Sequence, residues 1–362
     1  MKGLYVHIPF CEHICFYCDF CKRVPKNQQM IDDYLSTLKN EYSRVKNNIF
    51  DTIYIGGGTP SMLSPNQLEY LLGIFLDQKP KEFTIEVNPE SYTHEKGLIF
   101  KKYGVNRVSL GVQTFNEQVL HKLNRKHNNQ QVFDTVKSLK IAGITNVSVD
   151  LIFALPGQTI GAVKEDLDML NLLDITHLSY YSLILEKNTT FYNLYERNLY
   201  KPLDIDIEAD MFEFILDYLP RLGFRQYEVS NFSKSNDTKS LHNSLYWSLE
   251  PYEAIGAGAH GFDGKNRYYH TTNITEYITN SSITIEAQTE FMMYQDYLIF
   301  GLRKTGGISL IDVHKRFNRD PMVDFPKLNT FINDTYMEIK NDYLRFTKKG
   351  LFVSNQILGE FL

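Results

Sequence analysis

The chain has few cysteines, a single tryptophan and no long hydrophobic run. Its 362 residues include only four cysteines, all between Cys11 and Cys21. A secreted disulfide framework would distribute cysteines through the chain, so this crowding excludes one. No apolar segment reaches the roughly 18 residues that a membrane-spanning helix needs. The start of the chain, MKGLYVHIPFCEHIC, also lacks the apolar stretch and cleavage site of a signal peptide, so we expect a cytoplasmic protein.

Basic residues are slightly fewer than acidic residues. Lys plus Arg total 38 against 43 for Asp plus Glu, which leaves a net charge of −5. Proteins that bind nucleic acids usually carry an excess of basic residues. Because this chain has a net negative charge, we expect no nucleic-acid partner. The remaining composition, 43% hydrophobic and 22% charged, is that of an ordinary globular protein. The length suggests two domains, or one barrel-sized domain with an appendage.

Short β-branched runs alternate with amphipathic helical segments through the first two-thirds of the chain. The expected strands are Leu4–Ile8, Thr52–Ile55, Phe83–Val87, Arg107–Val112, Asn146–Phe153 and His177–Leu185. Apolar residues from Ile31 to Val45 recur at helical spacing, and Ser64 to Gln67 reads as a capping box that opens the next helix. Six such units in succession predict an α/β fold with a parallel sheet or partial barrel. Its functional loops would follow the carboxyl ends of the strands.

The pattern is looser after about residue 200. The expected elements are a helix over Ile207–Leu222, a strand over Gln226–Phe232, and a hairpin formed by Tyr343–Thr347 and Leu351–Ser354. Short helices followed by a hairpin predict a small α+β, winged-helix-like domain, which we read as a packing appendage. We therefore expect a barrel over residues 1–235, a connecting segment over 236–289 and a C-terminal domain over 290–362.

The cysteines form the pattern Cys11-x3-Cys15-x2-Cys18, directly after the first expected strand. Structural zinc normally takes four ligands from two arms of chain, and the sequence has no second cysteine pair. Three closely spaced thiolates instead suit a [4Fe–4S] cluster with one iron left for an external ligand. A zinc site completed by Cys21 or His13 is the alternative. We read Cys21 as an incidental cysteine.

Glycines and polar residues end several of the expected strands. The run from Gly56 to Pro60, GGGTP, follows the second strand, where bare backbone can approach a ligand closely, although such a run is most often a tight turn. Glu86, Gln113 and Asp150 close later strands. Each alone reads as a loop cap, but residues in these positions face the mouth of a barrel, where ligands bind.

Together these motifs resemble the radical S-adenosylmethionine (SAM) superfamily. The cysteine spacing matches its cluster-binding loop, and the phrases GGGTP, SLGVQTF and DLIFALPGQT resemble the branch of oxygen-independent coproporphyrinogen III oxidases and their relatives. The resemblance covers the chain from Tyr5 to about Phe262 and extends more weakly to its C-terminal Phe-Leu pair. It implies a (β/α)6 partial barrel in which SAM chelates the free iron. An electron from an external donor then cleaves SAM to a deoxyadenosyl radical.

The resemblance also implies particular residues for each cofactor. The implied cluster ligands are Cys11, Cys15 and Cys18. Tyr17 would pack against the adenine of SAM. The other implied SAM contacts are Tyr5, Gly57, Gly58, Thr59, Glu86, Gln113, Arg125 and Asp150.

The hexapeptide from His242 to Trp247, HNSLYW, contains the only tryptophan of the chain. A histidine beside aromatic rings can ligate haem iron while the rings pack on the macrocycle, although an isolated segment of this kind is more commonly core packing. Its HNxxYW pattern resembles the haem-binding signature of the haem-chaperone branch of the family. That resemblance implies haem as cargo, His242 as its ligand and haem-accepting proteins as partners.

We therefore expect a radical SAM-type haem chaperone, and the alternative is the oxidase, which decarboxylates propionates of coproporphyrinogen III. Three features favour the chaperone. Ten residues precede Cys11, Cys21 follows Cys18 at x2 rather than x1, and the hexapeptide is present. A redox-inactive iron–sulfur scaffold ranks last, because the SAM motifs are intact. We expect SAM cleavage but not oxidase activity. A homodimer, and a peripheral membrane contact through a haem acceptor, stay open.

Overall fold

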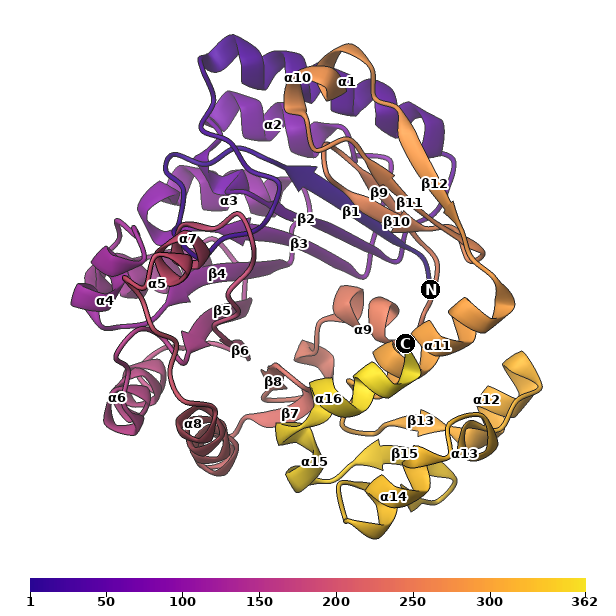
Figure 1. The fold of residues 1–362 in the computed structure, drawn as a ribbon. Helices are drawn as coiled ribbons and strands as arrows, with labels where there is room; N and C mark the ends of the chain where they lie inside the picture. The colour runs from indigo at the N-terminus through magenta and orange to yellow at the C-terminus, as the bar shows by residue number, and fades with distance from the viewer.

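The computed structural model describes residues 1–362 and has a curved sheet at its centre (Figure 1). Six neighbouring parallel strands form the middle of this sheet: β1 Gly3–Ile8, β2 Thr52–Gly57, β3 Glu82–Val87, β4 Arg107–Gln113, β5 Asn146–Phe153 and β6 His177–Ser182. The helices between and after them are α1 Gln28–Val45, α2 Pro65–Gly73, α3 His94–Lys102, α4 Glu117–Lys122, α5 Asn129–Ile141, α6 Ile160–Leu170, α7 Thr190–Glu196 and α8 Ile205–Tyr218. The six expected strands and their parallel arrangement are confirmed.

Further strands extend this sheet at both edges, so that it has twelve in all. The edge beyond β6 carries β8 Asn231–Ser233 and β7 Arg225–Glu228. The edge beyond β1 carries β9 Tyr252–Ile255, β10 His260–Phe262, β11 Asn266–His270 and β12 Ile283–Ala287. The single strand expected over Gln226–Phe232 is wrong: the chain reverses between β7 and β8, which pair antiparallel. Residues 236–289, expected as a connecting segment, supply four strands together with helices α9 Leu241–Trp247 and α10 Ile274–Thr279.

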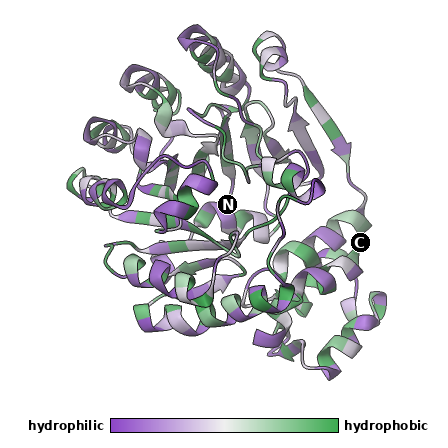
Figure 2. Cartoon of the chain, turned by 60° about the vertical axis from the view of Figure 1, so that its left-hand side comes forward, coloured by the Kyte–Doolittle hydropathy of each residue, from purple (hydrophilic) through white to green (hydrophobic).

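The two faces of the parallel strands differ in chemistry. Side chains such as Leu4, Ile53 and Val149 point outward and join a core of 53 buried residues under the helices. Figure 2 shows these helices ringing the strands. The alternate residues, such as Tyr54 and Ser109, point inward, because successive side chains of a strand lie on opposite faces. Barrel interiors are ordinarily filled by Val, Ile and Leu. The inner space here, which we call the lumen, is instead lined by polar and aromatic side chains.

Helix α9 lies inside the curve of the sheet (Figure 1) and is held at the amino ends of the strands. The carboxylate of Glu82, the first residue of β3, accepts hydrogen bonds from the backbone N–H groups of Leu241 and His242, each at 2.9 Å. The Ser240 hydroxyl also donates to Glu82, at 3.4 Å. Helix α9 therefore closes the lumen at the end opposite the cysteine loop.

The C-terminal region has its own core of 12 buried residues. Its elements are α11 Glu290–Gly301, β13 Ile308–Ser309, α12 Leu310–Phe317, α13 Pro321–Asp324, α14 Lys327–Asn333, β14 Met337–Lys340, β15 Tyr343–Phe346, α15 Lys348–Phe352 and α16 Ser354–Leu358. Short 3-10 turns complete the chain at Pro60–Met62, Pro89–Ser91, Leu219–Leu222, Asn236–Thr238 and Gly359–Phe361. None of the helices combines the length and the apolar character that crossing a bilayer requires.

The hairpin expected from Tyr343–Thr347 and Leu351–Ser354 is wrong, because β15 pairs with β14 instead. Asn341 and Asp342 form the turn, with φ angles of 52° and 63°. Asn and Asp tolerate this left-handed conformation, which tight hairpin turns require. The Thr347 hydroxyl then accepts a hydrogen bond from Gly350 N–H and begins helix α15, so the chain after β15 is helical.

Candidate metal centre and cofactor site

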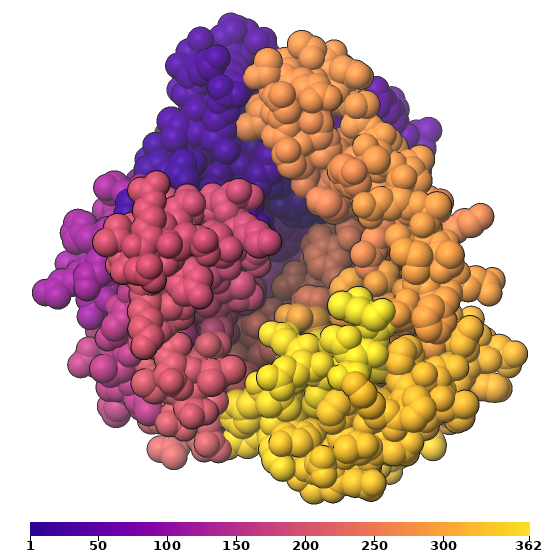
Figure 3. All heavy atoms as spheres, in the orientation of Figure 1, coloured from indigo at the N-terminus to yellow at the C-terminus, as the bar shows by residue number.

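A cavity of about 500 Å³ occupies the lumen. Figure 3 shows one face of the molecule hollowed between the segment around residues 180–200, the β9–β12 extension and the C-terminal end of the chain. Most of the residues expected at the site line this cavity: Cys11, Cys15, Tyr17, Cys18, Gly57, Gly58, Thr59, Glu86, Gln113, Arg125 and Asp150. Tyr5, Cys21 and His242 do not line it.

The cysteine loop follows β1 and is closed at its base. Cys11 N–H donates to the carbonyl of Arg23 at 3.1 Å, and Arg23 N–H donates to the carbonyl of Pro9 at 2.7 Å. Between these contacts the loop directs three thiols into the cavity. The Cys21 thiol instead donates to the carbonyl of Thr272 at 3.4 Å. The structure thus separates Cys21 from the other three cysteines.

The three thiols fit a [4Fe–4S] cluster better than a single metal ion. Burial raises the pKa of Cys11 to about 12, although Thr59 donates a hydrogen bond to its sulfur at 3.6 Å. Burial also raises the pKa of Cys18. The thiols of Cys11 and Cys18 are therefore protonated until a metal displaces the protons. No three such side chains meet closely enough to hold one ion. A cluster needs no such meeting point, since each cysteine binds a different iron.

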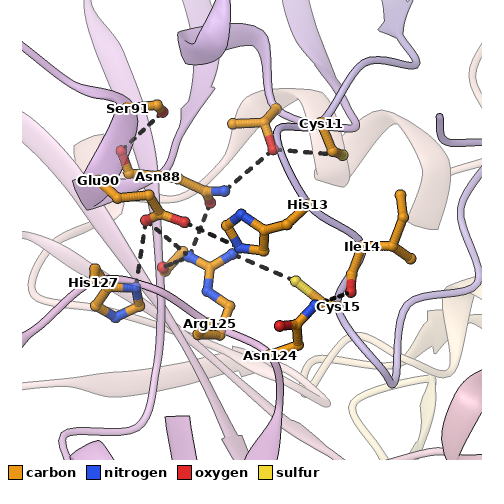
Figure 4. Close-up of polar contacts among 12 residues, drawn as sticks. Cys11, His13, Ile14, Cys15, Asn88, Glu90, Ser91, Asn124, Arg125 and His127 are labelled. Atoms are coloured by element: carbon orange, nitrogen blue, oxygen red, sulfur yellow. Dashed lines mark hydrogen bonds and ion pairs between the residues drawn. The ribbon is translucent and has the colours of Figure 1, made fainter. Parts of the chain in front are cut away.

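Arg125 joins the cysteine loop to two neighbouring strands (Figure 4). Its guanidinium donates to the carbonyl of Gly111 at 2.6 Å and to the side-chain oxygen of Asn88 at 3.0 Å. It also donates to the Cys15 sulfur at 3.8 Å. A positive charge beside a thiolate stabilises the ionised form. Arg125 is thus a support for Cys15 as well as a cavity residue.

Glu90 balances this buried charge, and the sequence did not identify it. Its carboxylate lies 3.7 Å from Arg125, 3.4 Å from His127 and 3.5 Å from His13. Burial opposes ionisation of Glu90, but His127 and Arg125 lower its pKa to about 2. Glu90 therefore stays ionised at neutral pH and orients Arg125. The only signal in the sequence that could have identified Glu90 is its position shortly after the strand that ends at Val87.

The glycine run makes room for β1 as well as for a ligand. Gly57 has a φ of 111°, and a Cβ there would lie 2.4 Å from the ring of His7. A Cβ at Gly58 would lie 2.6 Å from the carbonyl oxygen of Phe10. The expected reason for these glycines was close approach of a ligand. The structure adds a second reason, because the His7 ring and the backbone of Ile8 and Phe10 already fill the space.

Two buried carboxyls face the cavity from the neighbouring strands. Burial, with repulsion from Asp150, raises the pKa of Glu86 to about 7, against hydrogen bonds from Tyr54 and Gly57. The Tyr54 hydroxyl donates to Glu86 at 2.7 Å, and Gly57 N–H donates at 3.0 Å. The Asp150 carboxylate accepts from the Ser109 hydroxyl at 3.0 and 2.9 Å. Glu86 can therefore change its protonation near neutral pH.

Gln113 and Tyr5 are placed by strand geometry. Gln113 ends β4 at a bulge and has a φ of 70°, a strained conformation for a residue other than glycine. The bulge turns its side chain into the cavity. The Tyr5 hydroxyl is paired with His7 at 2.9 Å, and its ring stacks on Tyr54. Tyr5 thus lies in the lumen wall behind the cavity.

The structure places His242, the expected haem ligand, in the buried wall of the lumen. Only 1% of His242 is exposed. Its Nδ1 is paired with the Thr52 hydroxyl and its Nε2 with the Tyr246 hydroxyl, each at 2.7 Å. Its ring stacks on Tyr54 at 5.2 Å between centroids. Both ring nitrogens are engaged, so neither can reach an iron in this conformation. Trp247 lies under the guanidinium of Arg303 rather than beside an open surface.

Comparison with known proteins agrees with this geometry. Residues 5–170 match the Radical SAM superfamily and residues 293–353 match the HemN C-terminal domain. The solved structure of coproporphyrinogen III oxidase (HemN) from Escherichia coli, a radical SAM enzyme, has the same fold, with a TM-score of 0.86. It is 20% identical, and the match covers 99% of this chain and 89% of that one. The fold and the site together define a radical SAM protein, a class whose cofactors are a [4Fe–4S] cluster and SAM.

Curated relatives place the chain in one family within this class. Heme chaperone HemW of Lactococcus lactis subsp. lactis (strain IL1403) is 39% identical over 100% of this chain and 97% of its own length. The proteins of the same name from Bacillus subtilis (strain 168) and Escherichia coli (strain K12) are 37% and 32% identical. These matches cover 100% and 99% of this chain, and 99% and 98% of the relatives. The chain belongs to the HemW family.

Replacing Cys11, Cys15 or Cys18 by Ala is expected to abolish cluster binding, because each change removes one of three thiols that line the cavity. Cys21→Ala, the matched control, should keep four irons per chain, since its thiol points to Thr272. Iron and sulfide analysis with absorption near ~400 nm after anaerobic reconstitution measures this. Loss of iron in Cys21→Ala would contradict the assignment.

Glu86→Gln is expected to reduce the pH dependence of stability. The pKa of Glu86 is raised from 4.5 to about 7, so the folded protein holds this proton more tightly than the unfolded chain. The free energy of unfolding therefore falls as pH rises from 4.5 to about 7. Denaturant unfolding across this range should show a shallower fall in Glu86→Gln. Asp166→Asn should act likewise, since burial raises the pKa of Asp166 to about 7. An unchanged slope in both variants would refute the ionisation assigned to them.

Proposed function

We propose that this protein is a haem chaperone that binds haem and passes it to haem-requiring proteins. The observation that carries the proposal is similarity over the whole chain to relatives named heme chaperone, at 39% identity for the protein of Lactococcus lactis. The proposal requires haem-accepting proteins and an external electron donor as partners, and it assumes a cytoplasmic setting. The likeness to the oxidase, at 20% identity, concerns the fold alone.

We further propose that the lumen cavity is the cofactor site of this chaperone. Cys11, Cys15 and Cys18 would each bind a separate iron, and the cluster and SAM would together supply one-electron chemistry when bound. Arg125 supports the thiolate of Cys15 by a hydrogen bond. Thr59 donates a hydrogen bond to Cys11. Both donors are buried, so little water competes for these hydrogen bonds.

The SAM contacts belong to the same proposal. Backbone groups of Gly57 to Thr59 and the carboxylate of Glu86 lie together on the cavity wall, where they suit the polar groups of an amino acid. Gln113 and Asp150 face the same space from β4 and β5. Tyr17 lines the cavity beside the cysteines, in support of an adenine contact. Tyr5 would affect the SAM site only indirectly, through the lumen wall, because its hydroxyl is hydrogen-bonded to His7.

Parallel assays after anaerobic reconstitution test the function. The unmodified protein should bind haem, seen as a Soret band that titrates with added haem, and should release no carbon dioxide from coproporphyrinogen III under reducing conditions with SAM. Apo-protein carrying Cys11→Ala serves as the control for cluster-independent haem binding. Decarboxylation without haem binding would move the protein to the oxidase class.

His242→Ala is expected to cost stability and leave the haem spectrum unchanged. The substitution leaves the hydroxyls of Thr52 and Tyr246 unpaired beside a cavity, which should lower the free energy of unfolding by about 2 kcal/mol or more. Tyr246→Phe removes only one of these bonds and should cost less. Unfolding in urea and haem titration measure the two effects. A shifted Soret band with unchanged stability would instead identify His242 as a haem ligand.

A further inference from the structure

The end of the lumen farthest from the cysteines carries polar residues that the cofactor site does not use. We call Arg107, His177, Ser240 and Asn243 the lumen floor, and all four line the same cavity as the cysteines. Arg107 begins β4, whereas Gly111, four residues later, contacts Arg125 beside the cysteine loop. At 3.3 Å per residue this separation is about 13 Å. The lumen floor therefore lies well away from the proposed cluster.

Arg107 is a buried cation without a direct ion-pair partner. Only 2% of the residue is exposed. Its Nη1 donates to the side-chain oxygen of Asn146 at 3.2 Å and to the carbonyl of Thr238 at 3.0 Å, and both acceptors are neutral. No carboxylate lies within ion-pair distance, and the rest of the guanidinium makes no hydrogen bond within the protein. Burying an uncompensated charge is costly, so the arrangement calls for an anion.

The nearby carboxylates are engaged elsewhere. Asp150, on the strand beside Arg107, accepts the Ser109 hydroxyl on both of its oxygens, at 3.0 and 2.9 Å. Glu82, at the start of β3, accepts backbone N–H groups of α9 at 2.9 Å. Both acids are tied to neighbouring elements, and neither forms an ion pair with Arg107, although the positive charge of Arg107 favours the ionised form of Asp150.

The other floor residues add donors and no negative charge. Asn243 presents its side-chain amide to the cavity, and this amide makes no hydrogen bond within the protein. The ring of His177 is held between the Ser148 hydroxyl at 2.7 Å and the Tyr227 hydroxyl at 2.9 Å. Burial and the neighbouring Arg107 lower the pKa of His177, which is therefore neutral. One guanidinium and one free amide facing a cavity form a site for a carboxylate.

We propose that the lumen floor binds a carboxylate of the cargo, with Arg107 supplying the charge and Asn243 a hydrogen bond. This inference rests on the proposed function, since haem carries propionate carboxylates. The carboxylate of SAM is the other source of the same chemistry. The distance of about 13 Å along β4 favours the porphyrin, because SAM is expected beside the cysteines.

Haem and its dimethyl ester, in which the propionates are esterified, provide the test. The unmodified protein should bind haem about tenfold or more tightly than the ester, as expected for a charge-assisted hydrogen bond. Arg107→Gln should bind both at the level of the ester and keep its SAM affinity, measured by equilibrium dialysis. Arg303→Gln is the matched control, because this arginine lies over Trp247. It should keep the preference for haem.

Each outcome separates the inference from the proposed function. Equal binding of haem and ester by the unmodified protein would overturn the carboxylate site and leave the chaperone proposal standing. Absence of haem binding would overturn both. A loss of SAM affinity in Arg107→Gln, with the preference for haem intact, would assign the floor to SAM. If Arg107→Gln does not fold, Asn243→Ala replaces it, and a preference for haem that this variant fails to weaken would refute the proposed contact.

Discussion

Along the six parallel strands, every second side chain is apolar and faces the helices, while the side chains between them are polar and face the lumen. The outward residues supply the folding energy, because a fully buried Leu, Ile or Val contributes roughly 1.5–3 kcal/mol. They are nearly all inaccessible to solvent, as Leu4, Ile53 and Val149 show. The inward residues cannot be buried dry without partners. The same alternation that builds the core therefore leaves a polar lumen, and the residues of the cofactor site and of the lumen floor line it.

Within the lumen, the guanidinium of Arg125 holds together two loops and a neighbouring strand. Arg125 contacts Cys15 after β1, Asn88 after β3 and the carbonyl of Gly111 in β4. Glu90 keeps this arrangement electrically balanced, with its pKa lowered to about 2. Because two loops and strand β4 share this one charge, displacing Arg125 would disturb the cysteine loop and the cavity wall together. Cys15, an expected cluster ligand, is thus held by a residue that is distant in the sequence.

Local patterns explain why much of this could be predicted from the sequence. The strands β1 to β6, the cysteine loop and the glycine run depend on neighbouring residues, which periodicity and spacing reveal. The partners of β9 and His242 lie far away in the chain: Tyr252 pairs with Gly3, and His242 bonds to Thr52. No local pattern reveals such contacts, so the sheet extension was expected to be a connection, and the hydrogen bonds that hold His242 could not be foreseen. Arg107 could not be identified for a related reason, since only the folded barrel shows that its guanidinium has no ion-pair partner.

Helix α9 gives the hexapeptide a role that does not depend on iron ligation. One side of the helix presents Asn243 to the lumen, and Trp247 packs under Arg303 at the end of α11. The carbonyl of Arg303 also accepts Val229 N–H from the turn between β7 and β8. The C-terminal domain therefore contacts the same short helix that carries Asn243 of the lumen floor. A carboxylate bound at the floor would press on an element that the C-terminal domain also holds, so the aromatic hexapeptide would link the proposed carboxylate site to the appendage.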